Sequence, residues 1–224
     1  VAWNGDRGIF YKKNSNKEFF EKDSTYQLYY HKIGDIQSKD QLVFDTSNTK
    51  SNFSFFTKQN KLFIVETSED ETTKNYYYST IENESFQFKN FIKDDKSNLE
   101  LLNIINDKFY FSDEKYSWGN ISYFDINNRT ENTILIPQVY SHLLVGATFL
   151  ENYIICKYDN MGKYYMSIHD YTGKFIRKFE APHNMDFQIR FYDEKTNELF
   201  VTFYSYTISS LNYKLNITTG ANDI

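Results

Sequence analysis

The 224 residues carry 25 Lys and Arg against 30 Asp and Glu, and the net charge of -5 comes without a concentrated basic stretch, which argues against nucleic acid as a partner. Aromatic residues make up 19% of the chain, with 20 Tyr and 21 Phe, and such residues are enriched in β-strands. No apolar run reaches the roughly 18 residues that a membrane-spanning helix needs. The composition therefore excludes a helical membrane protein and favours a β-rich globular chain.

Short apolar runs, each bounded by polar turns, follow one another from the first residue onward. In chain order the first four cover residues 1–3, 8–13, 27–33 and 41–44. These runs are aromatic or β-branched and too short for helices, so we expect a strand at each. The same succession recurs at 53–56, 61–67, 75–81 and 86–91; at 99–105, 108–114, 120–126 and 132–137; at 144–150, 152–158, 165–171 and 174–180; and at 187–192, 198–205 and 211–217.

The second and third runs of each group form two ladders with one shared period. The second runs centre on Phe10, Phe63, Phe109, Ile154 and Phe200, at intervals of 53, 46, 45 and 46 residues. The third runs centre on Tyr29, Tyr77, Tyr123, Ile168 and Tyr213, at intervals of 48, 46, 45 and 45 residues. A period near 45 with four short strands per repeat is typical of a β-propeller, in which neighbouring blades cover each other's faces.

The sequence therefore predicts an all-β fold, a single β-propeller domain or fragment of about five four-stranded blades. The expected blades cover residues 1–45, 46–95, 96–138, 139–182 and 183–224, and the last lacks an evident fourth strand after Ile217. An irregular β-sandwich with an accidental strand spacing is the alternative. In either fold Cys156, the single cysteine, has no intramolecular disulfide partner, so we expect a buried, unreactive thiol and a cytoplasmic location.

Motifs that carry chemistry are missing from the sequence. No Gly-x-Ser-x-Gly segment offers a nucleophile elbow, and the acidic run 68–74 lacks the ligand alternation of a calcium loop. The histidines have neither zinc-ligand spacing nor a common location; they are His31, His142, His169 and His183. We therefore expect no catalytic residue, no metal and no cofactor in this chain.

Two stretches at the start resemble a known family. AWNGDRGIFYKK (2–13) and YQLYYHKIGDIQSKDQLVF (26–44) are similar to the propeller of prolyl oligopeptidases, where an Ala-Trp-x-x-Asp-x-x-x-Phe-Tyr strand pair precedes a Leu-Tyr-Tyr-His strand. Weaker similarity continues through 151–183 and 197–220. The resemblance implies a chain that begins within a seven-bladed propeller and supplies its later five blades. The parent would be a serine peptidase that cuts short peptides after proline.

The resemblance also implies a role and partners. The propeller would restrict access of short peptides to an α/β-hydrolase domain that carries the catalytic residues, and this chain alone would have no activity. In the matching stretch VETSED (65–70) the residues Thr67, Ser68 and Glu69 are candidates for facing the cavity. The family has an Arg and a nearby Cys there, and this chain has neither, so strict proline specificity does not follow.

Three further possibilities remain open at this stage. The chain could be a free-standing propeller that binds a protein or peptide, because propellers host many functions. It could belong to a related oligopeptidase that cuts after basic residues, for which Glu69, Asp70 and Glu71 would supply acidic side chains. An open blade edge would also favour self-association. No nucleic-acid or membrane partner is expected.

Overall fold

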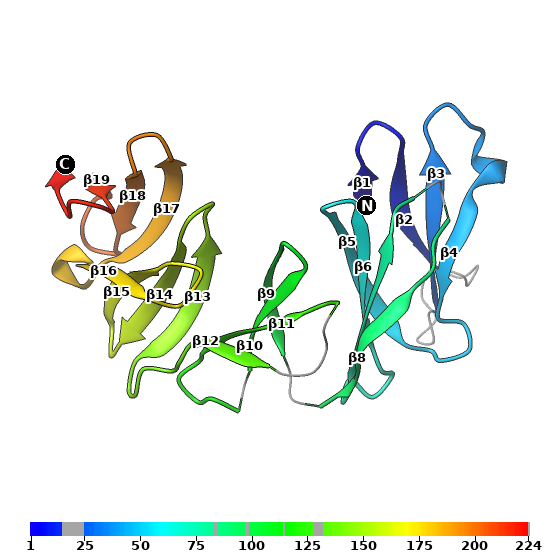
Figure 1. The fold of residues 1–224 in the computed structure, drawn as a ribbon, viewed down its shortest axis with the longest axis horizontal. Coiled ribbons are helices and arrows are strands. Elements are labelled where there is room, and N and C mark those ends of the chain that lie inside the picture. Colours follow the sequence, from blue (N-terminus) through cyan, green and yellow to red (C-terminus); the bar gives the residue numbers. More distant parts are fainter. Residues whose placement is uncertain (15–24, 83–84, 97–98, 114, 128–131, 224) are drawn as a thin grey trace. The chain divides into compact units, whose positions relative to one another are not determined.

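The strands form five four-stranded antiparallel sheets, which confirms the predicted all-β propeller fold (Figure 1). The structure is a computed structural model that describes residues 1–14, 25–82, 85–96, 99–113, 115–127 and 132–223. The chain divides into two compact units, Val1–Asn98 and Leu99–Ile224. None of the helices among the described residues is long and apolar enough to cross a membrane.

The first unit contains two sheets with the strands in sequence order. The first sheet comprises β1 (Ala2–Asn4), β2 (Gly8–Asn14), β3 (Tyr26–Lys32) and β4 (Gln41–Asp45), with the short 3₁₀ turn η1 (Gln37–Lys39) between β3 and β4. The second comprises β5 (Asn52–Lys58), β6 (Lys61–Thr67), β7 (Lys74–Thr80) and β8 (Lys89–Asp95).

One apolar cluster joins these two sheets. Phe10 and Leu28 from the first sheet pack with Phe53, Leu62 and Ile64 from the second, and all five are buried. Leu62 and Ile64 are two residues apart on β6, so they point to the same face of the strand. Burial of each such side chain contributes about 2 kcal/mol, so the face-to-face contact stabilises this unit.

The second unit contains three sheets built in the same way. They comprise β9 (Glu100–Ile105), β10 (Lys108–Ser112), β11 (Ile121–Asp125) and β12 (Thr133–Ile136); β13 (Leu143–Phe149), β14 (Ile154–Asn160), β15 (Lys163–His169) and β16 (Phe175–Glu180); and β17 (Asp186–Asp193), β18 (Glu198–Tyr204), β19 (Leu211–Asn216) and β20 (Asn222–Asp223). The 3₁₀ turn η2 (Pro182–Asn184) connects β16 to β17.

The middle sheet of this unit is apolar on both faces. Ile154, Cys156 and Tyr158 of β14 belong to the cluster shared with β9–β12. Ile155 lies between them in sequence, faces the other way and belongs to the cluster shared with β17–β20. A strand covered on both sides needs a continuous apolar run, which is why YIIC reads as unbroken rather than alternating.

In two places a lysine on the second strand of one sheet contacts the first strand of the next sheet. Lys12 donates to Asn52 Oδ1 at 2.5 Å and to the Phe53 carbonyl at 2.8 Å. Lys157 pairs with the Asp186 carboxylate and donates to the Phe187 carbonyl at 3.2 Å. Each ammonium group also lies over the ring of that phenylalanine, at 4.6 and 5.1 Å from its centroid.

Two outer strands differ from the sequence expectation. The fourth strand of the second sheet begins at Lys89, three residues later than the apolar run 86–91, because Phe86 and Phe88 pack against the apolar cluster before the strand starts. The last sheet does have a fourth strand, β20, but only two residues long, paired as Lys214 with Asp223 and Leu215 with Asn222. The expectation of a missing strand was therefore wrong, since even this short segment satisfies backbone groups of β19.

Candidate functional site

The residues predicted to face a cavity lie at the end of β6 and in the turn that follows. Thr67 is the last residue of β6 and pairs with Asn52 and Lys74. The Ser68 hydroxyl donates to the Asp70 carboxylate at 2.6 Å and accepts the Thr73 N–H at 3.0 Å, while Glu69 is exposed. Hydrogen bonds from Ser68 and Thr72 lower the pKa of Asp70 below its usual range. The turn is thus ordered by its own side chains, and the direction in which it faces within a whole propeller stays a prediction.

The buried residue of this stretch is Glu66, which the sequence analysis did not single out. Its side chain accepts hydrogen bonds from Ser51 Oγ at 2.5 Å, Tyr77 Oη at 2.8 Å and Thr49 Oγ1 at 3.3 Å. Glu66 is 7% exposed. The alternation Leu62, Ile64, Glu66 places it on the buried face of β6, and that period-two pattern was the signal that could have found it.

A histidine and an aspartate meet at the first sheet. His31 Nδ1 lies 2.6 Å from Asp40 Oδ1, and Tyr11 donates to Asp40 Oδ2 at 2.6 Å. Burial by itself would raise the pKa of Asp40, but the hydrogen bonds from Tyr11 and His31 outweigh it and lower that pKa. The three side chains come from β2, β3 and the end of the β3–β4 connection, so they fasten that connection to the sheet.

A serine and a histidine are also in contact on β15. Ser167 Oγ lies 2.8 Å from His169 Nε2, and the other ring nitrogen lies 3.2 Å from the Gly173 carbonyl. Ser167 is 7% and His169 9% exposed, and burial lowers the pKa of His169. A serine nucleophile must be reachable by its substrate and needs an oxyanion site beside it. The pair instead ties the 170–174 turn to β15, which is a structural role.

The remaining reactive groups are also withdrawn from solvent or dispersed. Cys156 is fully buried, and burial raises the pKa of its thiol to about 12, so it is not a thiolate at neutral pH. His142 Nδ1 lies 2.7 Å from Tyr165 Oη. Within the described part of the chain, no group of three or more His, Cys, Asp or Glu side chains could hold a metal ion.

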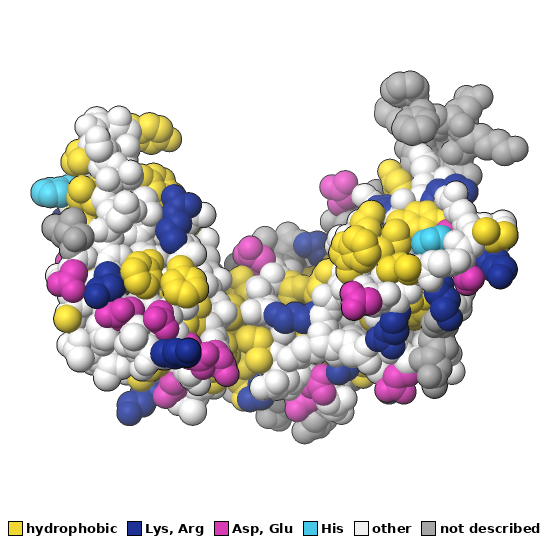
Figure 2. All heavy atoms as spheres, turned by 90° about the horizontal axis from the view of Figure 1, so that it is seen from above, with side chains coloured by type: hydrophobic (Ala, Val, Ile, Leu, Met, Phe, Trp, Pro, Cys, Tyr) yellow, Lys and Arg dark blue, Asp and Glu magenta, His cyan; other side chains and the backbone are white. Residues whose placement is uncertain are grey.

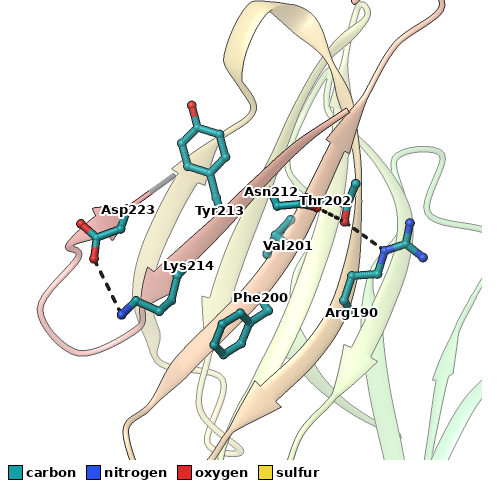
Figure 3. Close-up of a pocket in the computed structure, with 8 residues that line it drawn as sticks. All are labelled: Arg190, Phe200, Val201, Thr202, Asn212, Tyr213, Lys214 and Asp223. Carbon is teal, nitrogen blue, oxygen red and sulfur yellow. Dashed lines mark hydrogen bonds and ion pairs between the residues drawn. The ribbon is translucent and has the colours of Figure 1, made fainter. Parts of the chain in front are cut away.

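The outward face of the last sheet carries a shallow recess (Figure 3). Arg190 donates from Nε to Thr202 Oγ1 at 3.0 Å, and Thr202 in turn donates to Asn212 Oδ1 at 2.8 Å. Lys214 lies 3.8 Å from the Asp223 carboxylate, and Phe200 forms an apolar part of the wall. These side chains offer apolar contact and hydrogen bonding but no nucleophile paired with a base.

Charged side chains of both signs lie on the face drawn in Figure 2. On the face drawn in Figure 2, Lys and Arg side chains lie among Asp and Glu side chains, with groups of hydrophobic side chains between them. Interspersed charges of this kind give no electrostatic funnel toward one strongly charged ligand.

Comparison with known proteins places this architecture. A family model described as the prolyl oligopeptidase N-terminal beta-propeller domain matches residues 1–224. The chain is 23% identical over 237 residues to a prolyl endopeptidase of Elizabethkingia meningoseptica and 22% identical over 236 residues to one of Elizabethkingia miricola. All of the chain is covered, but only 33% of either relative. The chain thus spans about a third of the length of the curated relatives it matches.

Solved structures share the fold. A chain from a study of two prolyl endopeptidases and their inter-domain dynamics superposes with a TM-score of 0.78 at 17% identity, covering 99% of this chain and 34% of that one. Prolyl oligopeptidase B from Galerina marginata, bound to a 35mer substrate, gives 0.77 at 13% identity, with coverage of 96% and 32%. Oligopeptidase B from Trypanosoma brucei gives 0.66 at 14% identity, with coverage of 88% and 30%. Since the family model spans every residue, the chain belongs to the N-terminal β-propeller domain family of the prolyl oligopeptidases.

Proposed function

We propose that this chain is the non-catalytic propeller part of a prolyl oligopeptidase-like serine peptidase, and that it admits short peptides to a hydrolase domain while excluding folded proteins. The match of the family's propeller model to residues 1–224 carries this proposal. The buried Ser167–His169 contact supports the division of labour, because this serine and histidine are withdrawn from substrate.

In the parent enzyme the chemistry would be acyl transfer. A serine activated by histidine attacks the peptide carbonyl, and hydrogen-bond donors stabilise the oxyanion that forms. Those groups would belong to the hydrolase domain, which is the partner of this chain. Thr67 at the end of β6 and Ser68 and Glu69 in the turn that follows are the proposed contacts of this chain with the peptide cavity.

The first test is an assay of the purified chain alone with a chromogenic peptide that contains proline. We expect no turnover above the buffer blank. Turnover that co-purifies with the chain and disappears in the Ser167→Ala variant would overturn the proposal, because it would place the reaction within these residues.

The access role needs an active enzyme for its test. A chimera in which this chain replaces the matched third of the Elizabethkingia meningoseptica prolyl endopeptidase supplies one. We expect this chimera to cleave a short proline-containing peptide and to spare a folded protein that displays the same segment. Equal cleavage of both substrates would contradict the access role while leaving the family assignment intact.

A further inference from the structure

We propose that the groove between the last two sheets binds an extended segment of another polypeptide that carries two aromatic side chains two residues apart. The groove has a volume of about 760 Å³ and lies between β16 and the outer strands of the last sheet, all within the second unit (Figure 1). Its lining includes Phe179 of β16, Phe203 of β18, and Tyr213 and Leu215 of β19. The segment adds a strand to the last sheet and places its aromatic side chains in the groove.

The outer edge of β19 is open beside this groove. β20 ends at Asp223 and does not cover residues 211–213 of β19. The Asn216 N–H donates to the Ala221 carbonyl at 2.8 Å, and successive residues of a strand direct their backbone groups to alternate sides. Asn212, four residues before Asn216, therefore directs its N–H and carbonyl to the open edge. An extended segment can exchange both hydrogen bonds with it, as in other cases of strand addition.

The groove is apolar inside, and the charges at its rim are paired. Phe179 packs against the apolar cluster of the last two sheets. Lys178 Nζ lies 2.8 Å from the Glu180 carboxylate, and Lys214 Nζ lies 3.8 Å from the Asp223 carboxylate. Because each cation at the rim already has a carboxylate beside it, the groove favours uncharged, apolar side chains over a strongly charged ligand.

An added strand directs every second side chain into the groove. Leu211 and Tyr213 pack against the cluster that β19 shares with the preceding sheet. Residues of an added strand that lie opposite these two share their face, and the residue opposite Asn212 points away from the groove. The groove therefore fits a segment with apolar side chains at alternate positions.

The first unit shows which side chains fill the corresponding place there. Phe86 and Phe88, two residues apart, pack against the cluster between its two sheets just before β8 begins. The Phe88 ring lies 5.6 Å from the ring of Phe44, on the fourth strand of the preceding sheet, and the Phe86 ring lies 5.4 Å from that of Phe10. In the second unit Phe179 is the phenylalanine on the fourth strand of the preceding sheet that packs into the shared cluster. Aromatic side chains at alternate positions are thus the kind that fills this type of groove.

The repeat also shows why the groove of the last sheet is open. Lys89 and Asp223 occupy corresponding positions, because each pairs with the residue after the repeated tyrosine of the third strand. The residue before them is Phe88 in the second sheet and Asn222 in the last sheet. Asn222 lines the groove and is exposed, and its side chain is shorter than a phenyl ring and polar. A ring from another polypeptide can therefore occupy the space that Phe88 fills in the first unit.

A labelled peptide tests the proposal directly. The probe is acetylated and amidated Ser-Phe-Gln-Phe-Lys, the sequence of residues 85–89, with a fluorophore on the lysine side chain. Fluorescence anisotropy is measured with the full chain at concentrations at which it is monomeric. The control peptide, Ser-Phe-Phe-Gln-Lys, has the same composition, but its phenylalanines point to opposite faces of a strand. We expect saturable binding of the first peptide and binding of the second that is weaker by about tenfold or more.

Variants at Asn222 assign the binding to the groove. Asn222→Phe supplies the ring from the chain itself, so we expect peptide binding to weaken by about tenfold or more while the unfolding midpoint does not fall. Asn222→Ala leaves the groove open and should bind the peptide as the parent does. Equal binding of the two peptides, or unchanged binding by Asn222→Phe, would overturn the proposal.

The same variants distinguish a peptide from a second copy of this chain. If the peptide shows no saturable binding and Asn222→Phe shifts the chain toward monomer in sedimentation velocity, a second copy occupies the groove and the proposal is overturned. No binding and no shift would overturn it as well. The chimera tests the access role independently, so either result leaves the proposed function standing.

Discussion

Glu66 shows at the scale of one residue how a charged group becomes part of the core. Ser51, Thr49 and Tyr77 donate to its carboxylate from two neighbouring segments. Glu66→Ala would leave the buried Ser51 hydroxyl and the part-buried Tyr77 hydroxyl without this acceptor, and we expect a loss of about 2–4 kcal/mol in the free energy of unfolding. Urea unfolding measures it. The matched control is Glu69→Ala, at an exposed position of the same stretch, which should change the midpoint little.

His169 gives the chain a pH-sensitive element. Burial lowers its pKa in the folded state, so the unfolded chain binds a proton more readily than the folded one. This contribution to stability is complete above the unfolded pKa of about 6.5 and is lost as the pH falls through that value toward the lower folded pKa. Carboxylates whose pKa is lowered in the folded chain, such as Asp186, also stabilise the fold less as the pH falls, but they do so at lower pH than His169.

The His169 contribution is therefore measured as a difference between two proteins. We expect the unfolding free energy of the His169→Gln variant to fall less between about pH 7 and pH 5 than that of the parent, by about 1 kcal/mol at most. Urea unfolding at a series of pH values checks this. Parallel pH profiles for the two proteins would show that His169 does not carry the effect.

The two lysine contacts are the feature of interest at the scale of elements. Lys12 and Lys157 make the same three contacts with the first strand of the next sheet, but the acceptor is neutral Asn52 in one case and charged Asp186 in the other. Burial lowers the pKa of Lys12, in keeping with the neutral amide beside it. The same set of lysine contacts thus occurs once with a neutral amide acceptor and once with a charged carboxylate acceptor.

This difference predicts opposite outcomes for matched substitutions. Lys157→Met should cost about 1–2 kcal/mol, and its combination with Asp186→Asn should cost less than the sum of the single changes, because the pair acts as a unit. Asn52→Asp should instead stabilise the first unit by up to about 1 kcal/mol, more at low salt than at high salt. Chemical denaturation of the four variants checks both statements, and additive costs at Lys157 and Asp186 would refute the coupling.

At this same scale the sequence predicted the strands well and their ends less well. Runs such as KLFIVET and NYIICKY could be located because a sheet covered by neighbours needs apolar side chains at a regular spacing. The fourth strands were harder, since they lie at the sheet edge, where β8 starts after Phe88 and β20 has two residues.

Contacts between sheets left little trace in the sequence. Nothing in the spacing of Lys157 and Asp186, or of Trp118 and Tyr140, indicates that they meet, because such pairs depend on how whole sheets and loops lie. Glu66 is the intermediate case: its alternation with Leu62 and Ile64 predicts burial, but its hydrogen-bond donors come from other segments.

At the scale of the whole molecule, the outward face of the last sheet is the surface at which we expect self-association. Phe191 and Phe200 are 61% and 38% exposed there, and their rings lie 5.9 Å apart. The strand at the edge of the same sheet is only two residues long and pairs with Lys214 and Leu215, so β20 does not cover residues 211–213 of β19. Exposed apolar faces and uncovered strand edges both favour association.

We therefore expect the isolated chain to self-associate as its concentration rises. Phe200→Lys places a charge on the exposed face without touching Leu199 and Val201 on the buried face, so it should shift the population toward monomer and leave the unfolding midpoint nearly unchanged. Sedimentation velocity over a hundredfold range of concentration, with Leu42→Lys at an exposed position of the first unit as the control, measures the shift. A parent chain that stays monomeric throughout would contradict the prediction, and an equal response to both substitutions would place the contact elsewhere than on the last sheet.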